Sequence, residues 1–250
     1  MSMRKPIIIG NWKMNGSMAF AKEFVSELNT LVTSKACDIA ICPPATLLNT
    51  LAEALKNTNI ALGAQNVHFE EKGAFTGEIS TGMLKECGVK YVILGHSERR
   101  KYFADSNADI CKKVKSTIAA NLIPVLCVGE SLKEREEGNT EIHLHTELQE
   151  CLQGIQHPEN IIIAYEPLWA IGTGKTATPQ EANETIGFIR RELAKIFSEE
   201  IAQKIRILYG GSMNAQNAKS LLDMPEIDGG LIGGVSLIVK DFVSIINSNN

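Results

Sequence analysis

The sequence has 250 residues, of which 44% are hydrophobic and 22% are charged, the ordinary composition of a globular chain. A chain of this length can bury a core as one large domain or two small ones, and it needs no disulfide or metal to do so. With 25 basic residues against 29 acidic ones the net charge is −4, which argues against a nucleic-acid-coating surface but allows a positive pocket for a small anion.

Short runs rich in Ile, Val and Leu alternate with longer amphipathic segments. Most of the runs are apolar throughout, which suits parallel strands that are covered on both faces. The predicted strands are, in chain order, Pro6–Gly10, Asp38–Cys42, Ile60–Ala64, Tyr91–Leu94, Ile123–Val128, Ile161–Tyr165, Arg206–Tyr209 and Gly229–Ile232. The predicted helices include Ala19–Leu31, Leu47–Leu55, Asp109–Ala120, Glu141–Leu152 and Gln180–Phe197. Ser106 and Thr178 are predicted to begin two of the helices.

This alternation allows a doubly wound open sheet or a closed barrel. A chain of 250 residues divided among the predicted strands gives about 31 residues per repeat, roughly one strand, one helix and two loops. Gly10–Lys13, after the first strand, lacks the glycine fingerprint of the doubly wound fold. We therefore predict the α/β class and a single (β/α)8 barrel domain over residues 1–250.

Chemically useful residues follow several predicted strands, at the edge where a barrel places its active site. They are Asn11 and Lys13, His96, Glu166, and the glycine turns Gly210–Ser212 and Gly233–Gly234. Each residue alone has an ordinary structural interpretation, such as a surface lysine or a hydrogen-bonded core histidine. A cation, an imidazole, a carboxylate and two turns with free N–H groups at separate strand ends together favour an active site for an anion.

The segment Trp169–Thr176 ends in Gly-Lys-Thr, as a nucleotide-binding P-loop does. That motif requires a glycine where Trp169 stands, so the P-loop interpretation fails. An apolar middle between small residues suits a lid loop that closes over a ligand and expels water. A loop packed permanently on the barrel fits the pattern equally well.

Longer motifs resemble the triosephosphate isomerase family. They are Gly10–Asn15, Gly95–Arg100, Ala164–Gly174, Tyr209–Ser212 and Leu231–Gly234. The resemblance covers essentially the whole chain in order, and motifs of this length in combination are highly specific. Leu168 stands where the family commonly has valine and Val235 where it has alanine, and neither change removes a reactive group.

The resemblance implies a TIM-barrel isomerase of glycolysis and gluconeogenesis that interconverts dihydroxyacetone phosphate and D-glyceraldehyde 3-phosphate through an enediolate. It implies that Glu166 is the base and that His96 is a neutral electrophile at a helix N-terminus. Lys13 would carry positive charge beside the phosphate, with Asn11 orienting both. The implied phosphate contacts are the N–H groups of Gly172, Ser212, Gly233 and Gly234.

The connection Gln65–Glu78 is longer than the usual βα loop of about two to six residues. It resembles the interdigitating loop of the family, whose threonine, here Thr76, reaches a partner's site near Asn11. The resemblance therefore implies a homodimer. A self-packed Ω-loop on a monomer is the alternative.

No metal or redox cofactor is expected, because the chemistry stays within substrate and protein and the 5 histidines and 6 cysteines show no zinc spacing. Met1–Pro6 begins no signal peptide, so we expect a cytoplasmic protein with reduced thiols and no membrane or nucleic-acid partner. The acidic stretches Glu134–Glu137 and Glu141–Glu150 are predicted to be solvated helical faces. Two rival functions are a barrel aldolase with Lys13 as Schiff-base nucleophile, and a scaffold without catalysis.

Overall fold

A computed structural model describes residues 4–32, 35–170 and 176–248. Its strands are all parallel and close into one barrel in chain order, with the last strand pairing with the first. The strands are β1 (Ile7–Asn11), β2 (Asp38–Cys42), β3 (Ile60–Ala64), β4 (Tyr91–Leu94), β5 (Ile123–Val128), β6 (Ile162–Tyr165), β7 (Arg206–Tyr209) and β8 (Gly229–Ile232). The predicted fold class is therefore confirmed.

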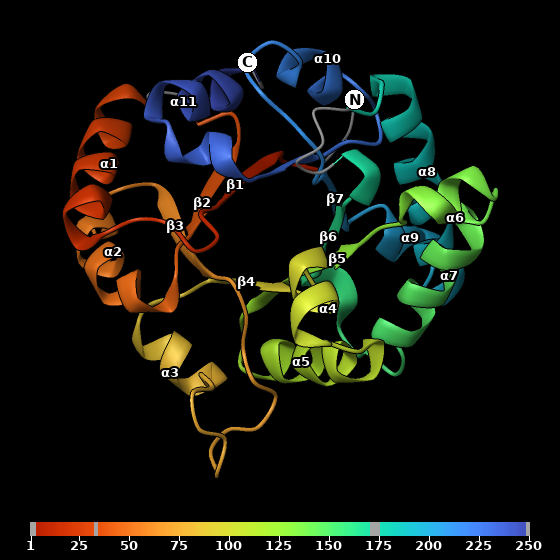
Figure 1. Cartoon of the computed structure of the whole chain (residues 1–250), viewed down its shortest axis with the longest axis horizontal. Coiled ribbons are helices and arrows are strands. Elements are labelled where there is room, and N and C mark those ends of the chain that lie inside the picture. The colour runs from red at the N-terminus through yellow and green to blue at the C-terminus, as the bar shows by residue number, and fades with distance from the viewer. Residues whose placement is uncertain (1–3, 33–34, 171–175, 249–250) are drawn as a thin grey trace.

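Helices form a ring around the strands (Figure 1). They are α1 (Met18–Leu31), α2 (Leu48–Leu55), α3 (Thr81–Glu86), α4 (Ser97–Phe103), α5 (Asn107–Ala119), α6 (Leu132–Glu136), α7 (Thr140–Cys151), α8 (Pro179–Ile196), α9 (Glu199–Ala202), α10 (Ala218–Leu222) and α11 (Val239–Asn247). Short 3₁₀ turns are η1 (Ala45–Leu47), η2 (Pro158–Asn160), η3 (Leu168–Ala170) and η4 (Gly234–Leu237).

The strands are apolar throughout because both of their faces are buried. Alternate residues such as Ile7 and Ile9 belong to a cluster inside the barrel. Ile8, between them, belongs to a second cluster that includes Phe24 of α1 and Phe242 of α11. Burial on two sides removes the in–out alternation that marks a half-exposed strand.

Helix starts are fixed locally by side chains. The Ser106 hydroxyl accepts a hydrogen bond from the Asp109 N–H at 3.1 Å, and Thr178 forms a capping box with Glu181. Both predicted starts are confirmed. The prediction of a solvated Glu141–Glu150 face is wrong for Glu147, which is only 5% exposed because it pairs with groups on the barrel side of α7.

The segment after β3 extends away from the ring of helices before the chain returns to α3 (Figure 1). Residues 70–78 of this segment are exposed, and they include Phe75 and Thr76. The carboxyl ends of the strands, which we call the barrel mouth, lie at the same end as this segment, because β3 runs directly into it.

Candidate active site

His96 stands at the mouth, immediately before a short helix. It is the N-cap of α4, and its Nδ1 accepts a hydrogen bond from the backbone N–H of Glu98 at 3.2 Å. An accepting ring nitrogen carries no proton, so the proton of the neutral imidazole is on Nε2. Nε2 lies 3.0 Å from Oε1 of Glu166, and His96 is 6% exposed. The ring therefore presents an N–H to the carboxylate.

Glu166 follows β6 and is buried, with 2% of its surface exposed. Its Oε2 accepts a hydrogen bond from the Ser97 N–H at 2.9 Å, and its Oε1 accepts one from the Ser97 hydroxyl at 3.4 Å. Burial raises the pKa of the Glu166 carboxyl above its ordinary value, although His96, the Ser97 N–H and Lys13 oppose the shift. A carboxylate held in this way is a stronger base than one in water.

Lys13 has a backbone φ of 52°, in the left-handed region that costs a non-glycine residue about 1 kcal/mol or more. Side chains hold this backbone from both sides. The Lys13 N–H donates to Oδ1 of Asn11 at 3.0 Å, and the Lys13 carbonyl accepts from Nε2 of Gln65 at 2.8 Å. The ammonium lies 2.5 Å from Oε1 of Glu98. Asn11 and Gln65 thus fix where the cation is placed.

One cavity of about 710 Å³ at the mouth brings most of the predicted site residues together, and its size suits a small ligand. The predicted residues that line it are Asn11, Lys13, His96, Glu166, Ser212, Gly233 and Gly234. Gly172, the remaining predicted phosphate contact, lies outside the described residues. The individual roles of all of these residues stay predictions.

The glycines after β8 leave room beside the lysine. A Cβ built at Gly233 would lie 3.6 Å from Cε of Lys13, and one built at Gly234 would meet no atom within 4 Å. The following turn η4 begins here, and the first N–H groups of a helical turn have no partner inside it. An anion in this corner would contact backbone N–H groups and the ammonium together.

Some functional residues were not predicted from the sequence. Ser97 binds the carboxylate of the candidate base, Glu98 pairs with the lysine, and Gln65 supports the lysine backbone. Ser97 and Glu98 lie within the quoted motif Gly95–Arg100, but no role was assigned to them. Glu130 lies two residues after the end of β5, so its position beyond a strand end also points to it.

Glu130 anchors the start of the predicted lid. It is fully buried, and its Oε1 accepts hydrogen bonds from the Trp169 indole at 2.9 Å and from the Tyr165 hydroxyl at 3.0 Å. The guanidinium of Arg135 lies 4.4 Å from the centroid of the Trp169 ring. The residues before the segment 171–175 are therefore firmly held, whereas the predicted lid tip lies outside the described residues.

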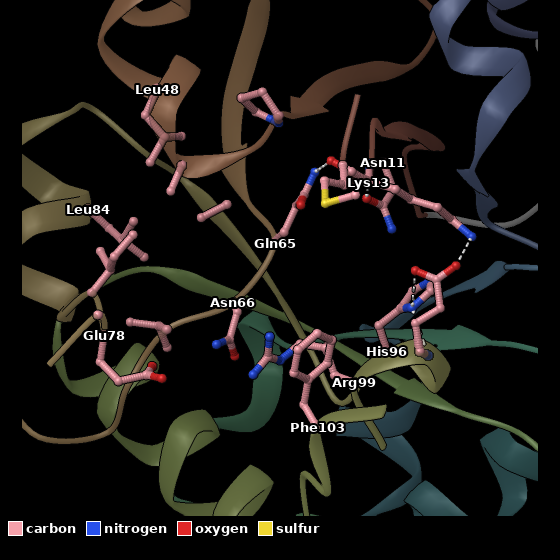
Figure 2. A pocket seen from close by; sticks show the side chains of 18 residues that line it. Asn11, Lys13, Leu48, Gln65, Asn66, Glu78, Leu84, His96, Arg99 and Phe103 are labelled. Atoms are coloured by element: carbon pink, nitrogen blue, oxygen red, sulfur yellow. Dashed lines mark hydrogen bonds and ion pairs between the residues drawn. The ribbon is translucent and has the colours of Figure 1, made fainter. Parts of the chain in front are cut away.

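A second cavity of about 350 Å³ adjoins the first (Figure 2). Gln65, Asn66 and Glu78 line it from the segment after β3, and Leu48 and Leu84 from two helices. The two cavities share four lining residues, which are Asn11, Lys13, His96 and Glu98. Figure 2 shows Lys13 and His96 on one side of this cavity, and both residues also line the first cavity.

A barrel whose mouth gathers a buried carboxylate, an imidazole N–H and a lysine beside glycine N–H groups defines an enzyme of the (β/α)8 class that moves protons on a small anion. The family model for triosephosphate isomerase matches residues 6–249. The chain belongs to the triosephosphate isomerase family.

Curated relatives are similar to this chain over nearly the whole length of both sequences. A triosephosphate isomerase of Clostridium novyi is 51% identical over 247 residues, covering 98% of this chain and 99% of the relative. One of Carboxydothermus hydrogenoformans is 51% identical over 250 residues, covering 99% and 100%. One of Clostridium botulinum is 50% identical over 247 residues, covering 98% and 100%. The family and the isomerase activity predicted from the sequence are confirmed, and neither rival function is favoured.

Proposed function

We propose that this chain interconverts dihydroxyacetone phosphate and D-glyceraldehyde 3-phosphate in the cavity of about 710 Å³. The observation that carries the assignment to this cavity is the contact of 3.0 Å between Oε1 of Glu166 and the protonated Nε2 of His96. A carbonyl shift between neighbouring carbons requires a base and a hydrogen-bond donor that reach the same substrate, and these two buried groups line one cavity.

The reaction is a proton exchange within the substrate. Glu166 removes the proton from the carbon beside the carbonyl, and the electron pair of that C–H bond forms the carbon–carbon double bond of the enediolate. His96 donates its Nε2 proton to the carbonyl oxygen as the π electrons of the C=O bond move onto that oxygen. His96 then takes a proton back from the hydroxyl of the neighbouring carbon, which becomes the new carbonyl, and the protonated Glu166 returns its proton to the former carbonyl carbon. Lys13 stabilises the negative charge that develops on the oxygen and that of the phosphate, and Asn11 holds the lysine backbone.

We propose that the phosphate binds the N–H groups of Gly172, Ser212, Gly233 and Gly234, and that the segment containing Gly172 is a lid. Two contacts of one arginine support the lid. The Arg135 guanidinium packs on the Trp169 ring, and its Nη2 lies 2.9 Å from Oε1 of Glu181, which forms the capping box with Thr178 at the start of α8. One arginine thus contacts the chain before and after the segment 171–175, and such contacts suit the supports of a lid.

An assay of the purified chain tests the activity and the site together. We expect triose phosphate isomerisation, measured in either direction with a coupled dehydrogenase. Borohydride added with either triose phosphate is expected to leave no adduct on Lys13, because the lysine acts as a charge and not as a nucleophile. An adduct found on Lys13 by mass spectrometry would favour the aldolase instead.

We also propose that the chain is a homodimer in which Thr76 of one copy enters the cavity of about 350 Å³ of the other. The rim of this cavity supports the proposal, since Met14 is 94% exposed and Phe103 is 66% exposed. Apolar side chains that gather at a cavity mark an interaction site. A second copy would cover them and would contact residues shared with the first cavity.

The substitution Thr76→Arg is expected to separate the dimer, because the longer side chain would overfill the space of a threonine and would bring a charge out of water beside Leu48 and Leu84. Sedimentation should then give half the wild-type mass, and kcat should fall by roughly tenfold or more as the shared residues lose their support. Ile142→Arg is the matched control, since Ile142 is 67% exposed on the surface of α7. A Thr76→Arg protein with unchanged mass would refute this interface.

We further propose that residues 1–250 form one catalytic domain that is located in the cytoplasm and acts without a cofactor. The closure of β8 against β1 supports the single domain, and six free cysteines, five of them buried, suit a reducing compartment. Among the described helices none is long and apolar enough to cross a membrane.

A further inference from the structure

Glu147 lies on α7, in the outer ring of helices, but its carboxylate points at the barrel. It is 5% exposed. Its Oε2 accepts a hydrogen bond from the Gly129 N–H at 2.9 Å, and its Oε1 lies 3.2 Å from Nη1 of Arg100 and 3.5 Å from Nε2 of His143. A buried carboxylate needs such partners to stay charged. One side chain thus binds the end of β5 and a cation of α4.

Arg100, which pairs with Glu147, also binds the backbone directly before His96. Its Nε donates to the Gly95 carbonyl at 2.7 Å, and its Nη2 donates to the Cys127 carbonyl at 3.0 Å. Gly95 is the residue directly before His96, and Cys127 lies in β5. The planar guanidinium therefore links the ends of β4 and β5 at a fixed separation, and Glu147 holds the guanidinium in place.

Gly129, whose N–H binds Glu147, also packs against the backbone of Glu166. A Cβ built at Gly129 would lie only 1.8 Å from the carbonyl oxygen of Glu166, so the two backbones are in direct contact. The Glu166 N–H also donates to the Val128 carbonyl at 2.8 Å. A shift of Gly129 would therefore displace the backbone of the base. Both members of the catalytic pair depend on segments that Glu147 holds.

The charges matter as well as the positions. The Arg100 guanidinium lowers the pKa of Glu166, although burial outweighs it, and Glu147 balances the charge of Arg100. A hydrogen bond with Glu147 raises the pKa of His143, whose Nδ1 lies 2.8 Å from Oε1 of Glu134 on α6. The other titratable groups facing this set are Cys151 beside the guanidinium, and His96, Lys13 and Cys127 around Glu166.

We propose that Glu147 is a positioning residue of the isomerase, which sets the placement of His96 and Glu166 through Arg100 and the Gly129 N–H. This inference rests on the proposed function, since it assigns Glu147 to the reaction for which His96 and Glu166 are proposed.

The substitution Glu147→Gln tests it, because glutamine keeps the shape but removes the charge and one acceptor. We expect kcat to fall about tenfold or more, as the loss of a hydrogen bond to a charged group implies. KM should stay within about twofold, because the phosphate corner lies on other strands. The acid limb of the kcat/KM profile should move to lower pH, because an unbalanced Arg100 lowers the pKa of Glu166 further.

Glu192→Gln is the matched control. Glu192 is also a buried glutamate of the outer ring, 2% exposed, and it binds a histidine of α7, with Nδ1 of His145 at 2.7 Å and Nζ of Lys195 at 2.6 Å. None of these contacts joins it to a strand end. We expect this control to lose stability while it keeps the wild-type kcat and pH profile.

The outcomes separate the inference from the function on which it rests. A wild-type chain without isomerase activity would refute the proposed function. An active wild type with a Glu147→Gln variant that matches Glu192→Gln in kcat and pH profile would overturn the role of Glu147. If Glu147→Gln does not fold, Arg100→Lys decides, because it keeps the charge but cannot bind both carbonyls. Its kcat should fall with an unchanged acid limb, and a wild-type kcat would overturn the proposal.

Discussion

Replacing Glu166 with glutamine is expected to lower kcat by roughly 10²–10⁴-fold, the usual contribution of a positioned general base. The glutamine fits the same space and can still accept from the Ser97 N–H, so the site keeps its shape. No other carboxylate contacts His96 from within the buried part of the cavity among the described residues, since Glu98 is half exposed. Steady-state kinetics with both triose phosphates provides the measurement, and full activity would rule out Glu166 as the base.

The same substitution should not reduce stability. Burial raises the pKa of Glu166 in the folded chain, so its protonated form favours folding and its charged form opposes folding. The stability it provides is present below its unfolded value of 4.5 and is lost as the pH rises through the higher folded value. Thermal unfolding of Glu166→Gln should therefore match the wild type in acid and equal or exceed it at neutral pH. A midpoint that falls only at neutral pH would contradict this sign.

Replacing Lys13 with methionine is expected to lower kcat/KM by roughly 10³-fold or more. Removal of a group that stabilises a developing oxyanion costs about 10²–10³-fold in kcat, and loss of a charged contact to the phosphate raises KM in addition. The substitution also leaves Glu98 without its ion pair at 2.5 Å, so its charge would repel the substrate. Steady-state kinetics would measure the fall in kcat, and the binding of inorganic phosphate to the free enzyme would measure the lost contact to the phosphate.

Two control variants separate charge from backbone strain at this position. Lys13→Arg keeps the charge and should retain measurable phosphate binding. Lys13→Gly removes the charge but accepts the φ of 52° without strain. It should be as inactive as Lys13→Met and at least as stable as the wild type. An active Lys13→Gly variant would show that the lysine charge is dispensable.

Much of the fold was predictable because each strand is marked by the residues of its own short segment. Strands that are buried on both faces give continuous apolar runs, and turns and charges interrupt these runs at their ends. The strand bounds agree except that β1 spans Ile7–Asn11 and β6 begins at Ile162, each shifted by one residue. The first shift has a cause in the barrel, since Asn11 pairs with Cys42 as the last residue of its strand.

Apolar periodicity predicted neither helix α4, whose start at His96 only the family resemblance implied, nor the buried state of Glu147. Residues 97–103 carry no apolar periodicity, and α4 has no buried residue, so its helical state depends on the cap at His96. Glu147 lies in a stretch of charges that is typical of a solvated face. Its burial depends on Arg100, which is distant in the sequence, and a pattern read within one segment cannot show a partner of that kind.

The site was predictable where residues follow strands and uncertain where one side chain supports another. Glu166 directly follows a predicted strand and His96 lies two residues after one, and the barrel brings such positions together. The support of the Lys13 backbone by Gln65 has no sequence signature, because it joins the ends of two different strands. Strand-end position thus brings reacting and supporting groups alike to the barrel mouth, but it does not show which residue supports which.

The four residues that line both cavities have a thermodynamic consequence. A ligand in one cavity and an occupant of the other meet the same Asn11, Lys13, His96 and Glu98, so a change in these side chains on binding in one cavity alters the surface offered to the other. By linkage, any factor by which an occupant of the second cavity tightens substrate binding must equal the factor by which substrate tightens the hold on that occupant. Substrate supply would then control how strongly the second cavity keeps its occupant.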